Sequence, residues 1–331
     1  MRLPDPADRP GDHVSTGDLP PPGHVRRLVD EAHARFAGVA DGTVSQVYPA
    51  LARMPAGLFG ICVVGTDASL HAVGDADHPF TIMSVSKPFV FALICDRIGP
   101  TGARERLGVN ATGRAFNAVA AADGGDGRTN PMVNSGAIAT TSLAEGADAD
   151  ARWRFIREGL SRFAGRELEL NDEVHASAIA TNSRNRGLAW LLESKGLLGC
   201  DPMQALDLYT RQCSLDVTAR DLAVMGATLA CGGFNPVTRD QVVAPEICHY
   251  ALAVMITAGL YETSGDWLYE VGLPGKSGIG GGIVTVSPGK GGLATFAPPL
   301  DAAGNSVRGQ LAARHLSHRL GLDLLASSPR R

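Results

Sequence analysis

The sequence lacks the long apolar run that a membrane span needs. A helix crosses a bilayer with about 20 consecutive apolar residues, and the 331 residues contain no stretch of that kind. The first residues, Met1-Arg-Leu-Pro-Asp-Pro, also lack the apolar core of an export signal. We therefore expect no membrane contact and a cytoplasmic location.

Paired cysteines and metal-ligand spacings are missing as well. The six cysteines form no C-x-x-C pair, and the nine histidines contain no H-E-x-x-H motif. Without an export signal, these cysteines are expected to stay reduced in the core. The sequence predicts no metal site and no cofactor. A net charge of −4 and a pI near 6.1 do not favour nucleic acid as a partner.

Lysine is scarce: only four of the 30 Lys and Arg residues are lysine. Arginine stays protonated in proteins, so we expect lysine where an amine must lose its proton. Two lysines lie in motifs with a serine, Ser84-Val-Ser-Lys87 and Lys276-Ser277-Gly278. The run from Ser287 to Lys290 has the same S-x-x-K spacing as Ser84 and Lys87, but its Pro-Gly pair predicts a turn.

Ser84 and Lys87 are predicted to lie at the start of a buried helix. Residues 85–98 are almost all apolar, which is typical of an interior helix, and Gly99-Pro100 predicts its end. Ser84 is a good N-cap, with Pro88 in the first turn. A partly desolvated amine there would lose basicity and could take the proton of a nucleophilic serine. The alternative is a capping serine with an incidental lysine, because chance supplies about one S-x-x-K in such a chain.

Patterns of apolar residues predict the order of strands and helices. A helix is expected at 24–37, a strand hairpin at 58–65 and 69–73, mostly helices from 101 to about 245, strands at 281–287 and 293–296, and a helix at 304–325. The fold class is therefore α/β (α+β): an antiparallel sheet from N- and C-terminal segments, flanked by helices, with a large helical insertion.

The chain divides into a tail and one domain. Residues 1–22 are rich in Pro, Gly and Asp and are predicted to be a disordered tail. Residues 23–331 are predicted to form one catalytic domain. Its sheet part spans about 23–100 and 246–331, and its helical part about 101–245. An S-x-x-K helix followed by K-S-G on a late strand is the pairing of serine β-lactamases and penicillin-binding proteins, so the layout resembles that fold.

Six further runs closely resemble, in order, motifs of the serine-dependent glutaminase family, from about residue 40 to residue 320. They are Asn130-Pro-Met-Val-Asn134-Ser-Gly-Ala-Ile138, Thr181-Asn-Ser-Arg-Asn185, Tyr209-Thr-Arg-Gln-Cys213-Ser214, Ala258-Gly-Leu-Tyr261, Gly272-Leu-Pro-Gly-Lys276-Ser-Gly-Ile-Gly-Gly281 and Pro298-Pro-Leu-Asp-Ala-Ala-Gly-Asn305-Ser.

The resemblance implies a catalytic set. Ser84 would attack the side-chain amide of L-glutamine, with Lys87 as its proton partner. Tyr261 would lie near the leaving group as a candidate proton shuttle. Lys276, Ser277 and Gly278 would support the site.

The resemblance also implies a substrate-binding set. Ile279 would lie beside the substrate through its backbone. Asn134, Asn185 and Tyr209 would bind the amino-acid head of the substrate.

Three positions depart from the family pattern. The family has an acid seven residues before the asparagine that corresponds to Asn185, expected to pair with the substrate α-ammonium, and here that position is Ala178. The family tyrosine of the A-D-Y-I-P run is replaced by Val47, and the glutamine before the nucleophile by Met83. The catalytic motifs are therefore kept, while the pocket that reads glutamine is changed.

Three functions remain open on this basis. The first is a glutaminase that forms glutamate and ammonia through an acyl-enzyme on Ser84. The second is a serine amidohydrolase of the same fold whose substrate differs, for example by lacking a free α-ammonium. The third is a non-catalytic relative that binds a small molecule or a partner. The resemblance further implies a homodimer or homotetramer.

Overall fold

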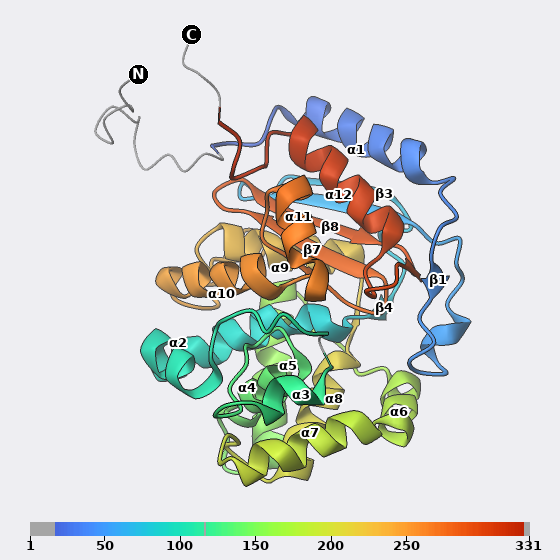
Figure 1. The fold of residues 1–331 in the computed structure, drawn as a ribbon. Helices are drawn as coiled ribbons and strands as arrows, with labels where there is room; N and C mark the ends of the chain where they lie inside the picture. Colours follow the sequence, from blue (N-terminus) through green and yellow to red (C-terminus); the bar gives the residue numbers. More distant parts are fainter. Residues whose placement is uncertain (1–16, 116, 328–331) are drawn as a thin grey trace.

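A five-stranded antiparallel sheet with helices on both faces forms the upper half of the molecule in Figure 1. The computed structural model describes residues 17–115 and 117–327. The strand order is β3-β2-β8-β7-β6, so N-terminal and C-terminal segments share one sheet, as the sequence predicts. Its strands are β2 (Gly60–Gly65), β3 (Leu70–Gly74), β6 (Gly275–Ser277), β7 (Gly282–Ser287) and β8 (Gly291–Phe296).

Two short strand pairs lie outside this sheet. They are β1 (Thr43–Val44) with β9 (Pro299–Leu300), and β4 (Phe80–Thr81) with β5 (Asp216–Val217). The second pair fixes the chain just before the Ser84 motif to the chain that follows helix α8 (Pro202–Cys213).

One face of the sheet is covered by helices from the two ends of the described chain, α1 (Pro22–Phe36) and α12 (Val307–Arg319), with α11 (Ser264–Val271) beside them (Figure 1). Strand side chains alternate between the two faces, and Ile61 and Val63 of β2 point to this side. They join Leu28 of α1 and Leu316 of α12 in one buried cluster.

The other face is covered by α9 (Ala219–Ala230), with α10 (Pro245–Ala258) nearby. A capping box starts α9: the Thr218 hydroxyl accepts from the Asp221 N–H, and the Asp221 carboxylate accepts from the Thr218 N–H. The helix lies so close to β8 that a Cβ on Gly292 would stand 2.3 Å from the Ala223 carbonyl oxygen. The predicted helical part includes α9, yet α9 packs on the sheet.

The remaining helices form the lower half of the molecule around α2 (Figure 1). They are α2 (Lys87–Leu107), α3 (Val119–Asp123), α4 (Asn134–Ser142), α5 (Ala149–Ala164), α6 (Asp172–Thr181), α7 (Ser183–Ser194) and α8, with the short 3₁₀ helices η2 (Leu51–Arg53), η3 (Met83–Ser86) and η4 (Tyr261–Thr263) in the connections. Residues 87–95 of α2 are all buried, which confirms the interior helix. None of the helices in the described residues is long and apolar enough to span a bilayer.

The start of the interior helix differs from the prediction. Ser84 is not an N-cap: it lies inside η3, and α2 begins at Lys87. The residue before α2 is Ser86, and its hydroxyl donates to the Met83 carbonyl oxygen (2.8 Å) rather than capping the helix. Serine often caps helices, but here the Ser84 side chain forms a hydrogen bond with Tyr261 and is not used as a cap.

Two other boundaries are shifted. The interior helix does break at Gly99 (φ 76°), but the chain continues helically to Leu107. The last helix is shorter than predicted: Ser306 caps its start by accepting from the Gly309 N–H, and the helix ends at Arg319.

The predicted tail is only partly within the described residues. Residues 1–16 lie outside them. Leu19 already packs against the cluster beneath α1, and α1 begins at Pro22. We therefore place the start of the packed domain before residue 23.

Candidate active site

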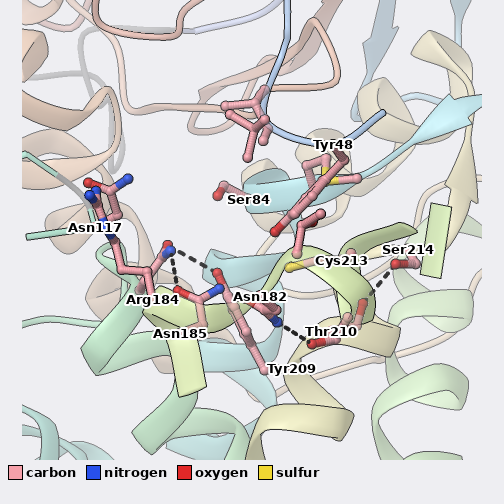
Figure 2. A pocket seen from close by; sticks show the side chains of 16 residues that line it. Tyr48, Ser84, Asn117, Asn182, Arg184, Asn185, Tyr209, Thr210, Cys213 and Ser214 are labelled. Carbon is pink, nitrogen blue, oxygen red and sulfur yellow. Dashed lines mark hydrogen bonds between the residues drawn. The ribbon is translucent and has the colours of Figure 1, made fainter. Parts of the chain in front are cut away.

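A pocket of about 100 Å³ lies where η3 meets the helical part and the loop after β6 (Figure 2). It contains Ser84 and the predicted binding residues Asn134, Asn185, Tyr209 and Ile279. Val47, Met83 and Ala178, the three departures, also line it. The structure thus brings together side chains from seven separate segments, listed here in full: Val47, Tyr48, Met83, Ser84, Asn117, Asn134, Ala178, Thr181, Asn182, Arg184, Asn185, Tyr209, Thr210, Cys213, Ser214 and Ile279.

The backbone is strained on both sides of the Ser84 hydroxyl. Met83 has φ +48° and Tyr261 has φ +57°, a left-handed conformation that is costly for side chains of this size. Met83 directly precedes Ser84 in the chain, and Tyr261 is the hydrogen-bond partner of the Ser84 side chain. Such strain persists only where the surrounding structure holds it, and it is typical of positions fixed for function.

Lys87 lies one turn after Ser84, and its side chain is 1 % exposed. Its Nζ donates to the Asn134 side-chain oxygen (2.8 Å) and to the Met132 carbonyl oxygen (3.2 Å). Burial lowers the pKa of the amine from 10.5 to about 7, because the charged form is poorly solvated. A substantial fraction of Lys87 is therefore neutral near pH 7, as a proton acceptor must be.

Tyr261 and Lys276 form the wall behind Ser84. Burial raises the pKa of the Tyr261 phenol to about 12, although hydrogen bonds to Ser84 and Ser277 act in the opposite direction. Lys276 Nζ stands 4.3 Å from the centre of the Tyr261 ring and donates to the carbonyl oxygens of Gly259 and Ser277, both at 2.7 Å. Burial lowers the pKa of Lys276 well below its usual value. Tyr261 therefore keeps its phenolic proton near neutral pH, and its ring lies against Lys276.

The K-S-G run lies on and just after β6, as predicted. Ser277 Oγ donates to the Asn305 side-chain oxygen (2.5 Å), so it supports the strand rather than the pocket. A Cβ on Gly278 would stand 3.1 to 3.3 Å from the Ile82 carbonyl oxygen, Val85 and Met83. Gly278 therefore lets β6 approach the turn that carries Ser84.

A hydrogen-bonded set of side chains links the base to the substrate-binding residues. The Asn134 oxygen accepts from Lys87 and from the Tyr209 hydroxyl (3.1 Å). The Asn134 amide nitrogen donates to the Asn185 oxygen (3.0 Å). Figure 2 shows Ser84 above Asn185 and Tyr209. These hydrogen bonds join Lys87, Asn134, Asn185 and Tyr209 in one unit.

Several pocket residues were not predicted from the sequence. Tyr48 follows the departure at Val47 directly, and burial raises the pKa of its phenol to about 12. Asn182 donates to the Thr210 hydroxyl (3.1 Å). Cys213 also lines the pocket, and burial raises the pKa of its thiol. The sequence does contain a signal for Tyr48: it is a tyrosine directly after Val47, the position where the family pattern has a tyrosine.

The Ser84 turn is anchored from behind by a second buried set. Ser86 Oγ donates to the Met83 carbonyl oxygen and accepts from Gln212 Nε2 (3.1 Å). The Gln212 oxygen accepts from the Thr141 hydroxyl (2.7 Å). Ser86, Gln212 and Thr141 are at most 1 % exposed. Helices α4 and α8 therefore hold the strained Met83 in place.

We expect Gln212→Leu to destabilise the protein by about 1–3 kcal/mol, because it removes the acceptor of the buried Thr141 hydroxyl and one hydrogen bond to Ser86. We also expect kcat to fall more than KM rises, because Gln212 contacts the turn but does not line the pocket. Chemical unfolding and steady-state kinetics measure both. Gln204, on the same helix and less buried, gives the matched control, Gln204→Leu. Equal effects of the two variants on kcat would contradict the anchoring role.

Ala178, the position where the sequence is expected to depart from the family, lines the pocket from α6 and is 3 % exposed. Among the described lining residues there is no Asp or Glu, and Arg184 is the charged one. No other acid within these residues takes the place that Ala178 leaves.

The antiparallel sheet, the adjoining helical part and the S-x-x-K turn between them define the β-lactamase-like fold. A sequence profile of the family described as Glutaminase matches residues 42–325. The chain is 69 % identical over 319 residues to Glutaminase 2 of Yersinia pestis, covering 96 % of this chain and 94 % of that protein. It is 46 % identical to a glutaminase of Mycobacterium ulcerans (strain Agy99), covering 91 % and 94 %.

Solved structures agree. A probable glutaminase, ybaS, superposes with a TM-score of 0.91 at 42 % identity, covering 92 % of this chain and 99 % of that one. The protein Mglu in its glutamate form superposes with a TM-score of 0.86 at 36 % identity, covering 93 % of this chain and 70 % of that one. This chain belongs to the glutaminase family, and it is an enzyme that hydrolyses glutamine to glutamate.

Proposed function

We propose that the reaction proceeds through an acyl-enzyme on Ser84, with Lys87 as general base. The observation that carries this proposal is the buried Lys87, whose pKa of about 7 leaves it able to accept a proton. In the first step the amine takes the Ser84 hydroxyl proton while Oγ bonds to the amide carbon of the substrate. The π electrons of the amide C=O bond move onto its oxygen, and a tetrahedral intermediate forms.

Collapse of that intermediate breaks the C–N bond. The leaving nitrogen needs a proton to depart as ammonia, and Tyr261, hydrogen-bonded to Ser84, is placed to relay the one held by Lys87. Backbone N–H groups of Ser84 and Ile279 are our candidates for stabilising the oxyanion. Water then attacks the ester by the reverse route, releasing glutamate and restoring Ser84. Asn134, Asn185 and Tyr209 bind the head of the substrate.

An amide-mimicking electrophile tests the nucleophile. We expect it to modify Ser84, and the modification rate to rise with pH through about 7, because only the neutral form of Lys87 can accept the proton. Peptide mapping by mass spectrometry locates the label. Cys213 lines the same pocket, so labelling of Cys213 in place of Ser84 would contradict the assignment.

We also propose, from the family resemblance, that the enzyme is a homodimer or homotetramer and acts in the cytoplasm. The six cysteines, all within the described residues and all free, support a reducing location.

A further inference from the structure

Tyr261 is held in a strained conformation by the short turn that it begins. It is the first residue of η4, and its φ is +57°. Within the turn, Thr263 Oγ1 donates to the Leu260 carbonyl oxygen (2.9 Å), and Ser264 Oγ braces the Tyr261 carbonyl oxygen by a second hydrogen bond (2.8 Å). A strained backbone persists only where its surroundings hold it. The position of the phenol therefore depends on what ties this turn to the rest of the site.

Asn305, in the loop between β9 and α12, joins the turn to strand β6. Its side-chain oxygen accepts from Ser277 Oγ (2.5 Å), and its amide nitrogen donates to Thr263 Oγ1 (2.9 Å). Asn305 and Ser277 are both fully buried. The Ser277 carbonyl oxygen in turn accepts from the Tyr261 hydroxyl (3.2 Å). One amide thus holds both the turn that carries Tyr261 and the strand residue that receives its phenol.

The loop that carries Asn305 is itself fixed. Asp301 Oδ1 accepts from the backbone N–H groups of Ala303 (2.9 Å) and Asn305 (3.0 Å). The Asp301 N–H donates back to the Asn305 carbonyl oxygen (2.8 Å). Asp301 Oδ2 accepts from Gln310 Nε2 of α12 (2.8 Å). Asn305 is therefore presented by a closed loop that is tied to a helix.

The same loop lies against residues of the site. Gly304 has φ +95°, and a Cβ on it would stand 3.6 Å from Ile279 Cγ2 and 3.7 Å from the Tyr261 ring. Ile279 lines the pocket, and Tyr261 is hydrogen-bonded to Ser84. Asn305 is not among the described residues that line the pocket. Any influence of Asn305 on the reaction must therefore pass through the groups that it holds.

We propose that Asn305 is a positioning residue for the reaction: its side-chain amide holds the Tyr261 phenol beside Ser84, where the phenol can relay a proton to the leaving nitrogen. This inference rests on the proposed function, in which Tyr261 passes on the proton held by Lys87. Asn305 takes no proton itself, because its amide only accepts from Ser277 and donates to Thr263.

Asn305→Ala removes both side-chain hydrogen bonds and leaves the pocket lining unchanged. We expect kcat for glutamine to fall about tenfold to a hundredfold, since a small misplacement of a catalytic group can cost this much. KM should change by less than about threefold, because the residues that bind substrate stay in place. Initial rates of ammonia release over a range of glutamine concentrations separate the two constants.

Asn235→Ala is the matched control. Asn235 is also fully buried and also fixes a loop, since its amide nitrogen donates to the Arg162 carbonyl oxygen (2.8 Å) and its oxygen accepts from the Val237 N–H (2.9 Å). It is not among the described residues that line the pocket. We expect Asn235→Ala to lower the melting temperature and keep its kcat.

A pair of substitutions at Thr263 tests the same link without emptying the Asn305 site. Thr263→Val keeps the shape but removes the oxygen that accepts from Asn305, and we expect it to lower kcat. Thr263→Ser keeps the hydroxyl, and we expect it to keep near wild-type turnover. This pair decides the question even if Asn305→Ala fails to fold. Equal turnover of the two Thr263 variants would overturn the inference.

A double-mutant cycle with Tyr261→Phe identifies the route by which Asn305 acts. Because the phenol that Asn305 holds is then gone, Asn305→Ala should lower kcat by less than about twofold in the Tyr261→Phe background. The same loss of kcat in both backgrounds, or an equal loss from Asn235→Ala, would overturn the inference and leave the Ser84 mechanism intact. Undiminished turnover of Tyr261→Phe itself would instead overturn the proton relay of the proposed function, and the inference with it.

Discussion

Replacing Ser84 by alanine is expected to abolish glutamine hydrolysis while the protein stays folded. Loss of a serine nucleophile costs about 10⁴-fold or more in kcat. The structural cost is small, since Ser84 does not cap a helix, and loss of its hydrogen bond to Tyr261 should cost about 1 kcal/mol. Ammonia release and thermal unfolding measure the two effects separately.

The matched control is Ser287→Ala. Ser287 begins the second run with S-x-x-K spacing, but its hydroxyl donates to the Leu322 carbonyl oxygen (3.0 Å) behind the sheet. We expect this variant to lose some stability and keep its turnover. Activity that survives in Ser84→Ala, or disappears equally in Ser287→Ala, would contradict the assignment of the nucleophile.

Lys87→Arg is expected to be as inactive as Ser84→Ala. Arginine keeps the positive charge but stays protonated, so it cannot accept the serine proton. The wild-type enzyme should show kcat/KM rising with pH through about 7, because the active form of Lys87 is the deprotonated one and is populated above its pKa. Steady-state kinetics from pH 5.5 to 9 check both statements.

Lys290→Arg is the control for that substitution. Lys290 is also largely buried, and its Nζ donates to the Gly321 carbonyl oxygen (2.7 Å), a bond that arginine can make as well. We expect near wild-type turnover from this variant. Near wild-type turnover from Lys87→Arg would instead show that Lys87 acts through its charge and not as a base.

The candidate catalytic residues could be identified in the sequence because their motifs are local. Ser84 and Lys87 lie three residues apart, and Lys276 begins a run whose spacing is fixed by a strand. The register of Ala178 could be predicted as well, since α6 and α7 follow each other directly. The antiparallel sheet could be predicted because strand patterns occur near both ends of the chain.

The remaining features depend on packing between distant segments. Whether Ser84 caps a helix or faces a pocket is decided by Tyr261, which lies far along the chain. Gln212 reaches Ser86 only because α8 packs against η3. Tyr48 enters the pocket because its loop is tied to α6, where the Ala50 N–H donates to Ser177 Oγ (3.3 Å). No local pattern encodes these contacts.

Trapping the acyl-enzyme tests the central claim most directly. Wild-type protein mixed with glutamine and quenched in acid within milliseconds should carry one γ-glutamyl group, and peptide mapping should place it on Ser84. We expect a Ser84 ester that forms before ammonia release is complete and is absent from Ser84→Ala. Full turnover with no covalent adduct under any quench time, or an adduct on Cys213, would contradict it.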